Sequence, residues 1–177
     1  MAAFDAGFLI FLLHQNPRVP LDPRTRQPVT KVKERVAHLV ASLEKAREKI
    51  LIPTPALSEA LTLVADSASD YLSEITNTYG FEIAGFDTMA AIEAAIAASD
   101  AKKRGGKKGG SDSTWAKVKF DRQIIAIAKV RGVETIYSND EDVRKFAERE
   151  GIKVMALWDL PEPPPKQEEM FDETEAT

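Results

Sequence analysis

Short apolar segments alternate with longer, helix-like segments along most of this chain. Five of them have the length and the apolar side chains of buried strands, and they lie at residues 2–5, 50–52, 81–84, 135–137 and 153–157. No turn sequence typical of a hairpin separates them. Strands joined through helices pair in parallel. The alternation therefore predicts an α/β fold, an α/β/α sandwich around a short central parallel sheet of about five strands.

The length of the chain favours a single domain. With 177 residues, 44% of them apolar, it can bury one sizeable core. We expect the domain to span residues 1–161 and residues 162–177 to form a disordered acidic tail. The chain has no cysteine, which excludes disulfides and thiolate chemistry. The longest apolar run, residues 8–13, is too short to cross a bilayer, so we expect a cytoplasmic protein that does not enter membranes.

Charge is distributed unevenly along the chain. The net charge is −4, of which residues 162–177 contribute −5, so the remainder carries +1. Within that remainder, residues 102–113 are rich in glycine and lysine and are expected to form a flexible basic loop. This region is either a solvated linker or an arm that contacts nucleic acid phosphates. The candidate phosphate contacts are Lys102, Lys103, Arg104, Lys107, Lys108, Lys117 and Lys119.

Four acids fall near the carboxyl ends of the expected strands. Asp5 ends the first strand, and Glu59 lies in the helix that follows the second. Asp140 follows the fourth strand. Asp121 is expected in the first turn of a helix at residues 119–130 that leads to this strand, a position that could face either way. In open parallel sheets, ligands bind outside the carboxyl ends of the strands. The four side chains are therefore expected to share one rim of the sheet.

Such a cluster needs a positive partner. Without a compensating lysine nearby, carboxylates a few ångströms apart would repel one another strongly. A site that offers only oxygen ligands favours the hard cations Mg²⁺ or Mn²⁺. Two such ions can stabilise both the attacking and the leaving oxygen of a phosphodiester. The acids therefore indicate a metal site suited to phosphodiester hydrolysis.

Several stretches of the sequence resemble motifs of the PIN-domain ribonucleases, a family that includes the VapC-like toxin nucleases. Residues 4–6 (Phe-Asp-Ala) are similar to the family's first acid at the end of its first strand, and residues 53–61 to its second. Residues 121–128 (Asp-Arg-Gln-Ile-Ile-Ala-Ile-Ala) resemble its most recognisable stretch. Residues 137–140 (Tyr-Ser-Asn-Asp) resemble the turn that closes its site, with the pair Asp142 and Val143 beside it.

The resemblance implies a metal-dependent endoribonuclease that hydrolyses RNA phosphodiester bonds. Asp5, Glu59, Asp121 and Asp140 would be its catalytic and metal-binding residues, supported by Ser138 and Asp142. The chain would then be a candidate toxin of a type II toxin–antitoxin pair, with an antitoxin protein as its partner and a homodimer as its expected assembly. The proline-rich loop at 16–27, the basic loop and the acidic tail make the chain longer than the compact toxin form.

Other interpretations stay open from the sequence. Each acid alone is also explained as a helix cap or as part of a solvated helix face. The same fold would also suit a non-catalytic RNA-binding or assembly module, which metal-dependent RNA cleavage would distinguish from an enzyme. A phosphatase of the haloacid-dehalogenase type needs a second acid two residues after Asp5, where this chain has Gly7.

Overall fold

A five-stranded sheet, parallel throughout, organises the chain in the computed structural model, which describes residues 1–14, 16–78 and 80–164. The strand order is β3-β2-β1-β4-β5, which puts β1 at the centre. The strands are β1 (Ala2–Phe4), β2 (Ile50–Pro53), β3 (Phe81–Ala84), β4 (Thr135–Tyr137) and β5 (Lys153–Met155). The α/β fold and parallel sheet expected from the alternating pattern are confirmed.

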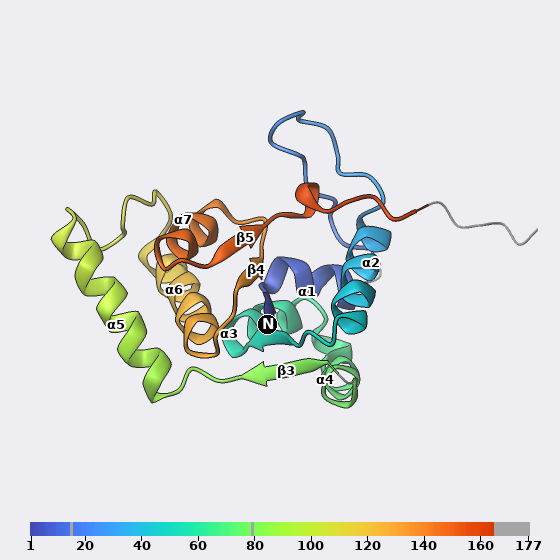
Figure 1. Ribbon diagram of the computed structural model, residues 1–177, viewed down its shortest axis with the longest axis horizontal. Helices are drawn as coiled ribbons and strands as arrows, with labels where there is room; N and C mark the ends of the chain where they lie inside the picture. The colour runs from blue at the N-terminus through green and yellow to red at the C-terminus, as the bar shows by residue number, and fades with distance from the viewer. Residues whose placement is uncertain (15, 79, 165–177) are drawn as a thin grey trace, which may run out of the picture.

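Helices cover both faces of this sheet (Figure 1). Helices α1 to α4 lie on one side, and α5 to α7 lie on the other. The helices are α1 (Ala6–Leu13), α2 (Val32–Lys45), α3 (Thr54–Thr62), α4 (Ala68–Asn77), α5 (Thr88–Lys103), α6 (Trp115–Val130) and α7 (Glu141–Arg149), with short 3₁₀ helices η1 (Ala65–Ser67) and η2 (Leu157–Asp159). The sheet is thus the middle layer of the expected sandwich.

Alternate strand residues face the two cores. Phe4 and Ile52 belong to the core beside α1, and Ala3 and Leu51 belong to the core beside α6. All four are fully buried. Strands covered on both faces have no polar side, which is why these segments read as continuous apolar runs rather than as alternating ones.

The largest difference from expectation lies in α6. The sequence pattern predicted a helix from residue 119, but α6 begins at Trp115, where the Thr114 hydroxyl caps it by accepting a hydrogen bond from the Lys117 amide. Val118 in its first turn is fully buried. The basic side chains around this turn gave it the appearance of a linker. Asp121 consequently lies in the second turn, and the expectation that it is a first-turn acid is wrong.

The basic segment is more structured than its composition indicates. Lys102 and Lys103 belong to the last turn of α5. The backbone then turns through Gly109 and Gly110, whose φ angles of +66° and +81° lie in the left-handed region that glycine adopts without strain. Their carbonyl oxygens accept hydrogen bonds from Arg149 and from Lys145 in α7. The flexibility expected of residues 102–113 stays a prediction.

Most of the acidic tail, residues 165–177, lies outside the described residues. Glu162 at its start is held in place, because its carboxylate pairs with Lys31 at 3.2 Å and with Arg35 at 3.0 Å. Among the helices of the described ranges, none combines the length and apolar composition needed to span a membrane.

Candidate metal centre

A cleft opens at the carboxyl edge of the sheet, next to its central strand. Asp5, Glu59, Asp121 and Asp140 all line it, so the structure brings together the four acids singled out from the sequence. Hereafter this is the acid cleft. Its location follows from the strand order, because β1 and β4 are neighbours and end side by side at Phe4 and Tyr137. The residues that follow these two strands therefore meet at one place.

Asp5 is the most constrained of the four. It caps α1, where its Oδ1 accepts a hydrogen bond from the Phe8 amide at 3.0 Å. Its Oδ2 accepts a short hydrogen bond from the Ser138 hydroxyl. Burial raises the pKa of Asp5 to about 6, although these two hydrogen bonds lower it. The charges of Asp140 and Glu59 add a smaller increase to the pKa. Asp5 is therefore a fixed carboxylate whose charged form lacks solvation.

Ser138 connects two of the acids. While its hydroxyl donates to Asp5, its Oγ accepts a hydrogen bond from the Asp140 amide at 3.0 Å. The side chain is 1% exposed and so has no alternative partner in solvent. Asp140 caps α7 through Oδ1, which accepts from the Asp142 amide at 2.8 Å. One hydroxyl thus connects the carboxylate of Asp5 with the backbone of Asp140, and the supporting role expected of Ser138 stays a prediction.

Asp142 is held by two residues that sequence reasoning missed. Its Oδ2 accepts hydrogen bonds from the hydroxyls of Ser111, at 2.7 Å, and Ser113. Burial alone would raise the pKa of Asp142, but these hydrogen bonds and the nearby lysine charges outweigh it and lower the pKa. The Ser-Asp-Ser sequence was the available signal, and its glycine-rich surroundings concealed it.

Asp121 is paired with a lysine one helical turn earlier. Lys117 Nζ lies 3.0 Å from Asp121 Oδ2, 2.7 Å from Asp140 and 3.8 Å from Asp142. Burial raises the pKa of Asp121 to about 6 in spite of this partner. The expectation that no lysine compensates the acids is therefore wrong, because α6 starts early enough to carry Lys117 into the cluster.

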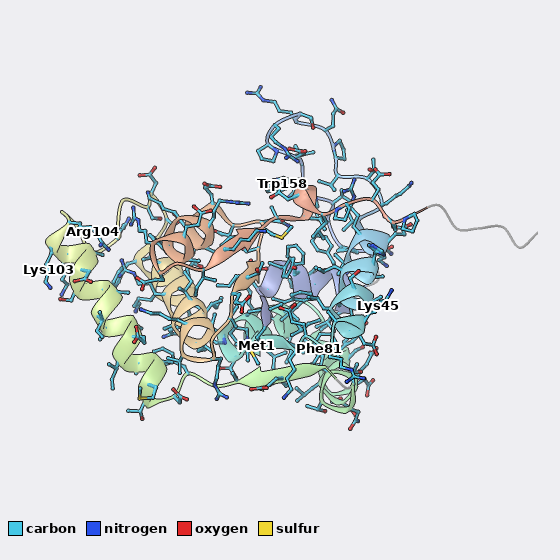
Figure 2. All side chains as sticks on the ribbon, in the orientation of Figure 1. Met1, Lys45, Phe81, Lys103, Arg104 and Trp158 are labelled. Carbon is cyan, nitrogen blue, oxygen red and sulfur yellow. The ribbon has the colours of Figure 1, made fainter. Side chains whose placement is uncertain are left out.

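The remaining predicted residues lie at different distances from this cluster. Glu59 lies on α3, where it is exposed, and it faces Asp5 closely enough to raise that residue's pKa. Lys107 and Lys119 lie outside the cleft, over the ring of Trp115, at 5.2 Å and 6.0 Å from its centroid. Figure 2 shows Lys103 and Arg104 at the far end of α5. Of the seven basic residues, Lys117 is the one that the structure places among the acids.

The cluster has the donor set of a site for a hard cation. Asp121, Asp140 and Asp142 each bring one carboxylate oxygen to within 4.8 Å of the others. An ammonium group already lies among these oxygens, which shows that the surroundings accommodate a positive charge. Oxygen-only donors suit Mg²⁺ or Mn²⁺. The residues therefore fit such an ion, provided that Lys117 gives way.

Solved structures of the FitAB, VapBC and VapC kinds share this fold. A chain of FitAB bound to an IR36 DNA fragment aligns with a TM-score of 0.57 at 20% identity, covering 91% of this chain and 98% of that one. DNA-bound VapBC from Salmonella typhimurium aligns with a TM-score of 0.55 at 16% identity, covering 88% of this chain and 97% of that one. VapC20 of Mycobacterium tuberculosis, described as a Sarcin-Ricin loop cleaving toxin, aligns with a TM-score of 0.51 at 14% identity, covering 82% of this chain and 94% of that one. No protein-family model matches the sequence, and no curated protein matches it significantly.

These likenesses establish the fold. The five-stranded parallel sheet between two helical layers is a PIN-like α/β/α fold. The chain shares this fold with the FitAB, VapBC and VapC structures, as the sequence resemblance indicated.

Proposed function

We propose that the chain is a divalent-cation-dependent ribonuclease that hydrolyses RNA phosphodiester bonds at the acid cleft. The observation that carries the proposal is the convergence of Asp5, Asp121 and Asp140 beside the central strand of a PIN fold. Two of these carboxylates are buried with their pKa values raised to about 6, which a bound cation would reverse. The description of VapC20 as a Sarcin-Ricin loop cleaving toxin supports the choice of reaction.

Each acid has a distinct part in this proposal. Asp121, Asp140 and Asp142 would hold the cation, and Asp5 and Glu59 would face it from the lining of the same cleft. Mg²⁺ or Mn²⁺ would supply a Lewis acid that polarises a phosphate oxygen and makes water more acidic. Asp5 is fixed by two hydrogen bonds, so it can orient a water molecule without losing its own position.

The rim of the cleft suits a nucleic acid. Phe120 lines it with a side chain that is 48% exposed, and such a ring can stack on a base. Lys119, the residue before Phe120 on α6, is exposed and basic. We propose that these two residues contact RNA that enters the cleft.

A toxin role with an antitoxin partner is the biological setting that we propose. Among the structures that share the fold, FitAB and VapBC are complexes bound to DNA. A homodimer is also proposed, because α5 exposes an apolar stripe of Met89, Ile92 and Ile96 that a second copy could cover. Sedimentation of the parent and of the Ile92→Asp variant tests the dimer. A monomeric parent would contradict it.

The experiment that tests the reaction compares the parent protein with Asp121→Asn. Purified protein is incubated with structured and unstructured RNA, with Mn²⁺, with Mg²⁺ or with EDTA, and the products are separated on a gel. The parent should cleave only with a cation, and Asp121→Asn should not cleave although it remains folded. Cleavage by Asp121→Asn at near the parent rate would overturn the assignment of the site.

One observation favours a non-catalytic alternative. Because Lys117 already neutralises part of the cluster, the acids can be stable without a metal ion. On this alternative the chain is an RNA-binding or assembly module on a PIN fold. RNA binding without cleavage in either cation would favour it over the ribonuclease.

A further inference from the structure

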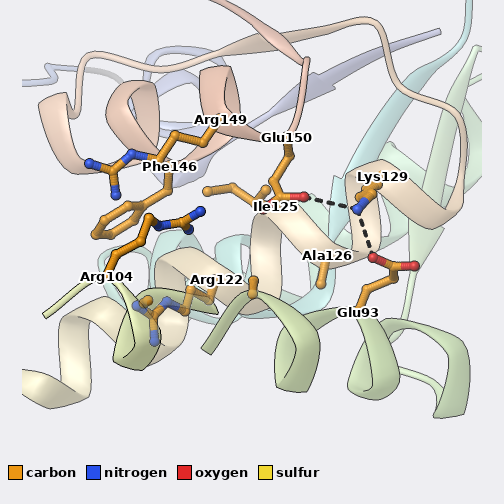
Figure 3. Close-up of a pocket in the computed structure, with 11 residues that line it drawn as sticks. Glu93, Arg104, Arg122, Ile125, Ala126, Lys129, Phe146, Arg149 and Glu150 are labelled. Atoms are coloured by element: carbon orange, nitrogen blue, oxygen red, sulfur yellow. Dashed lines mark hydrogen bonds and ion pairs between the residues drawn. The ribbon is translucent and has the colours of Figure 1, made fainter. Parts of the chain in front are cut away.

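Three arginines converge on a pocket between α5, α6 and α7. Arg104 ends α5, Arg122 lies on α6 and Arg149 lies on α7, and all three line the pocket together with Phe146. Figure 3 shows the three arginine side chains at the end of the pocket where Phe146 lies. This is hereafter the arginine pocket. Its position is separate from the acid cleft, because none of its lining residues lines that cleft.

Arg122 is the buried member of the group. Its side chain lies between two aromatic rings, 5.6 Å from the centroid of Trp115 and 5.6 Å from that of Phe146, and the residue is 7% exposed. Its Nη1 has no hydrogen-bond partner in the described part of the chain. A buried donor left without a partner costs about 1–3 kcal/mol. A group that accepts this hydrogen bond would recover that cost.

The arginines also lack a counter-charge. Within the described ranges, no carboxylate lies within ion-pair distance of Arg104, Arg122 or Arg149. Burial, and then the charges of the other two arginines, lower the pKa of Arg122. Three like charges around one pocket therefore leave it strongly positive.

The acids at the other end of the pocket do not change this. Glu93 and Glu150 both pair with Lys129, at 2.8 Å and 2.9 Å, as the dashed lines in Figure 3 indicate. Lys129 offsets only one of these two carboxylate charges, so this end of the pocket keeps a net charge of −1. The three arginines give the other end +3, and this is the positive end of the pocket.

The loop backbone at Gly109 packs against the positive end of the pocket. Arg149 Nη1 donates a hydrogen bond to the Gly109 carbonyl at 3.0 Å. A Cβ atom at Gly109 would come within 3.1 Å of the Phe146 ring and within 3.4 Å of the guanidinium nitrogens of Arg122 and Arg149. The loop backbone can therefore pack against the arginines only because residue 109 has no side chain.

We propose that the arginine pocket binds a phosphate group through Arg104, Arg122 and Arg149. A phosphate offers several acceptor oxygens and up to two negative charges, which matches converging guanidinium forks better than one carboxylate does. Lys107 and Lys119 next to Trp115 extend the positive surface outward. The phosphate is either free or carried by a nucleic acid; only its delivery by RNA rests on the ribonuclease proposal.

Calorimetric titration with inorganic phosphate tests the site directly. The full chain is used in EDTA without RNA, so that neither the metal site nor cleavage affects the result. The variant Arg104→Gln/Arg149→Gln removes two largely exposed guanidinium groups, which keeps the test valid even if a change at buried Arg122 prevents folding. Arg47→Gln, an exposed arginine at the end of α2, is the matched control.

The parent and the control should bind phosphate, and the double variant should bind it at least about tenfold more weakly. Equal affinity in all three proteins, or no binding by the parent at millimolar phosphate, would overturn the proposal.

A second set of ligands distinguishes the source of the phosphate. Short RNAs with a 5′-phosphate, the same RNAs with a 5′-hydroxyl, and a glutamate-rich peptide are compared on the same proteins in EDTA. Weaker binding of either RNA by the double variant supports phosphates carried by RNA, and an effect on inorganic phosphate alone supports a free anion. A peptide that binds to the parent while neither phosphate nor RNA does would overturn the phosphate assignment in favour of an acidic partner.

Discussion

Helix α6 carries two consecutive residues into sites of opposite charge. Asp121 enters the acid cleft, and Arg122 enters the arginine pocket, with exposures of 6% and 7%. In the cleft, Lys117 supplies a counter-charge from within the chain. In the pocket, no acid of the described residues supplies one for Arg122. The charges of the cleft are thus partly balanced within the chain, whereas the charge of Arg122 in the pocket needs an anion from outside the described residues.

The loop between α5 and α6 makes hydrogen bonds with residues of both sites. On one side of the loop between α5 and α6, the hydroxyls of Ser111 and Ser113 hold Asp142. A few residues earlier, the carbonyl of Gly109 accepts a hydrogen bond from Arg149. The basic segment therefore has a structural role at both sites, in addition to any binding of nucleic acid.

The largest effect is expected for Asp140→Asn at the acid cleft. The amide oxygen can still cap α7, while the charge that faces Lys117 is removed. RNA cleavage should therefore fall by a factor on the order of 10³, with folding retained. A single-turnover cleavage assay measures this, beside circular dichroism for folding.

The matched control is Asp87→Asn. Asp87 caps α5 through the Ala90 amide, as Asp140 caps α7, but it lies outside the acid cleft. The control should cleave at the parent rate. If the two variants lose activity equally, capping rather than charge explains the effect.

The second effect is a dependence of stability on pH. The folded pKa values of Asp5 and Asp121 are about 6, raised by burial above the ordinary value of 3.8. The folded protein therefore holds protons that the unfolded chain releases, so the stabilising contribution is complete below 3.8 and is lost as pH rises through about 6. The metal-free melting temperature should fall from pH 5 to pH 7, and saturating Mn²⁺ should flatten this slope. A parallel slope with Mn²⁺ would place the cation elsewhere.

A smaller effect is expected for Lys117→Gln. Removing the ammonium leaves the three acids without their internal cation, so a divalent ion no longer competes with it. Mn²⁺ should bind about tenfold more tightly, as measured by calorimetry. Lys119→Gln, two residues later and exposed, should bind Mn²⁺ like the parent. Weaker binding by Lys117→Gln would show that the lysine supports the site.

The smallest effect concerns salt. If RNA phosphates reach the arginine pocket, Arg104→Gln/Arg149→Gln should make the negative slope of log affinity against log salt less steep, by about 0.7 for each RNA phosphate that the variant no longer binds. Fluorescence anisotropy at several salt concentrations measures the slope. An unchanged slope would confine RNA to the acid cleft.

The acid cleft was predictable because topology determines it. Because the strands are parallel, Asp5 and Asp140 could be placed at the same edge of the sheet from the sequence. They lie close together because β1 and β4 are neighbours, which the structure shows. The role of Lys117 could not be predicted, because it depends on where α6 begins. That boundary rests on the Thr114 cap and on the burial of Val118, which are weak signals within a basic segment.

The arginine pocket was not predictable for a different reason. Its three arginines come from three helices, and no short motif connects Arg104 with Arg149. Arg122 lies within the stretch that resembles a PIN motif, but the sequence interpretation assigned a function there only to its neighbour Asp121. Only the packing of α5 and α7 against α6 shows that these side chains converge.

The central position of β1 has a consequence for synthesis of the chain on the ribosome. Asp5 leaves the ribosome early, but its partner Ser138 belongs to a segment made more than a hundred residues later. Until β4 has emerged, β1 lacks a neighbouring strand on one edge, and Asp5 at the end of β1 lacks Asp140 beside it. A nascent chain therefore carries the first half of the cleft without the second, and any activity of the site has to wait until nearly the whole domain has been translated.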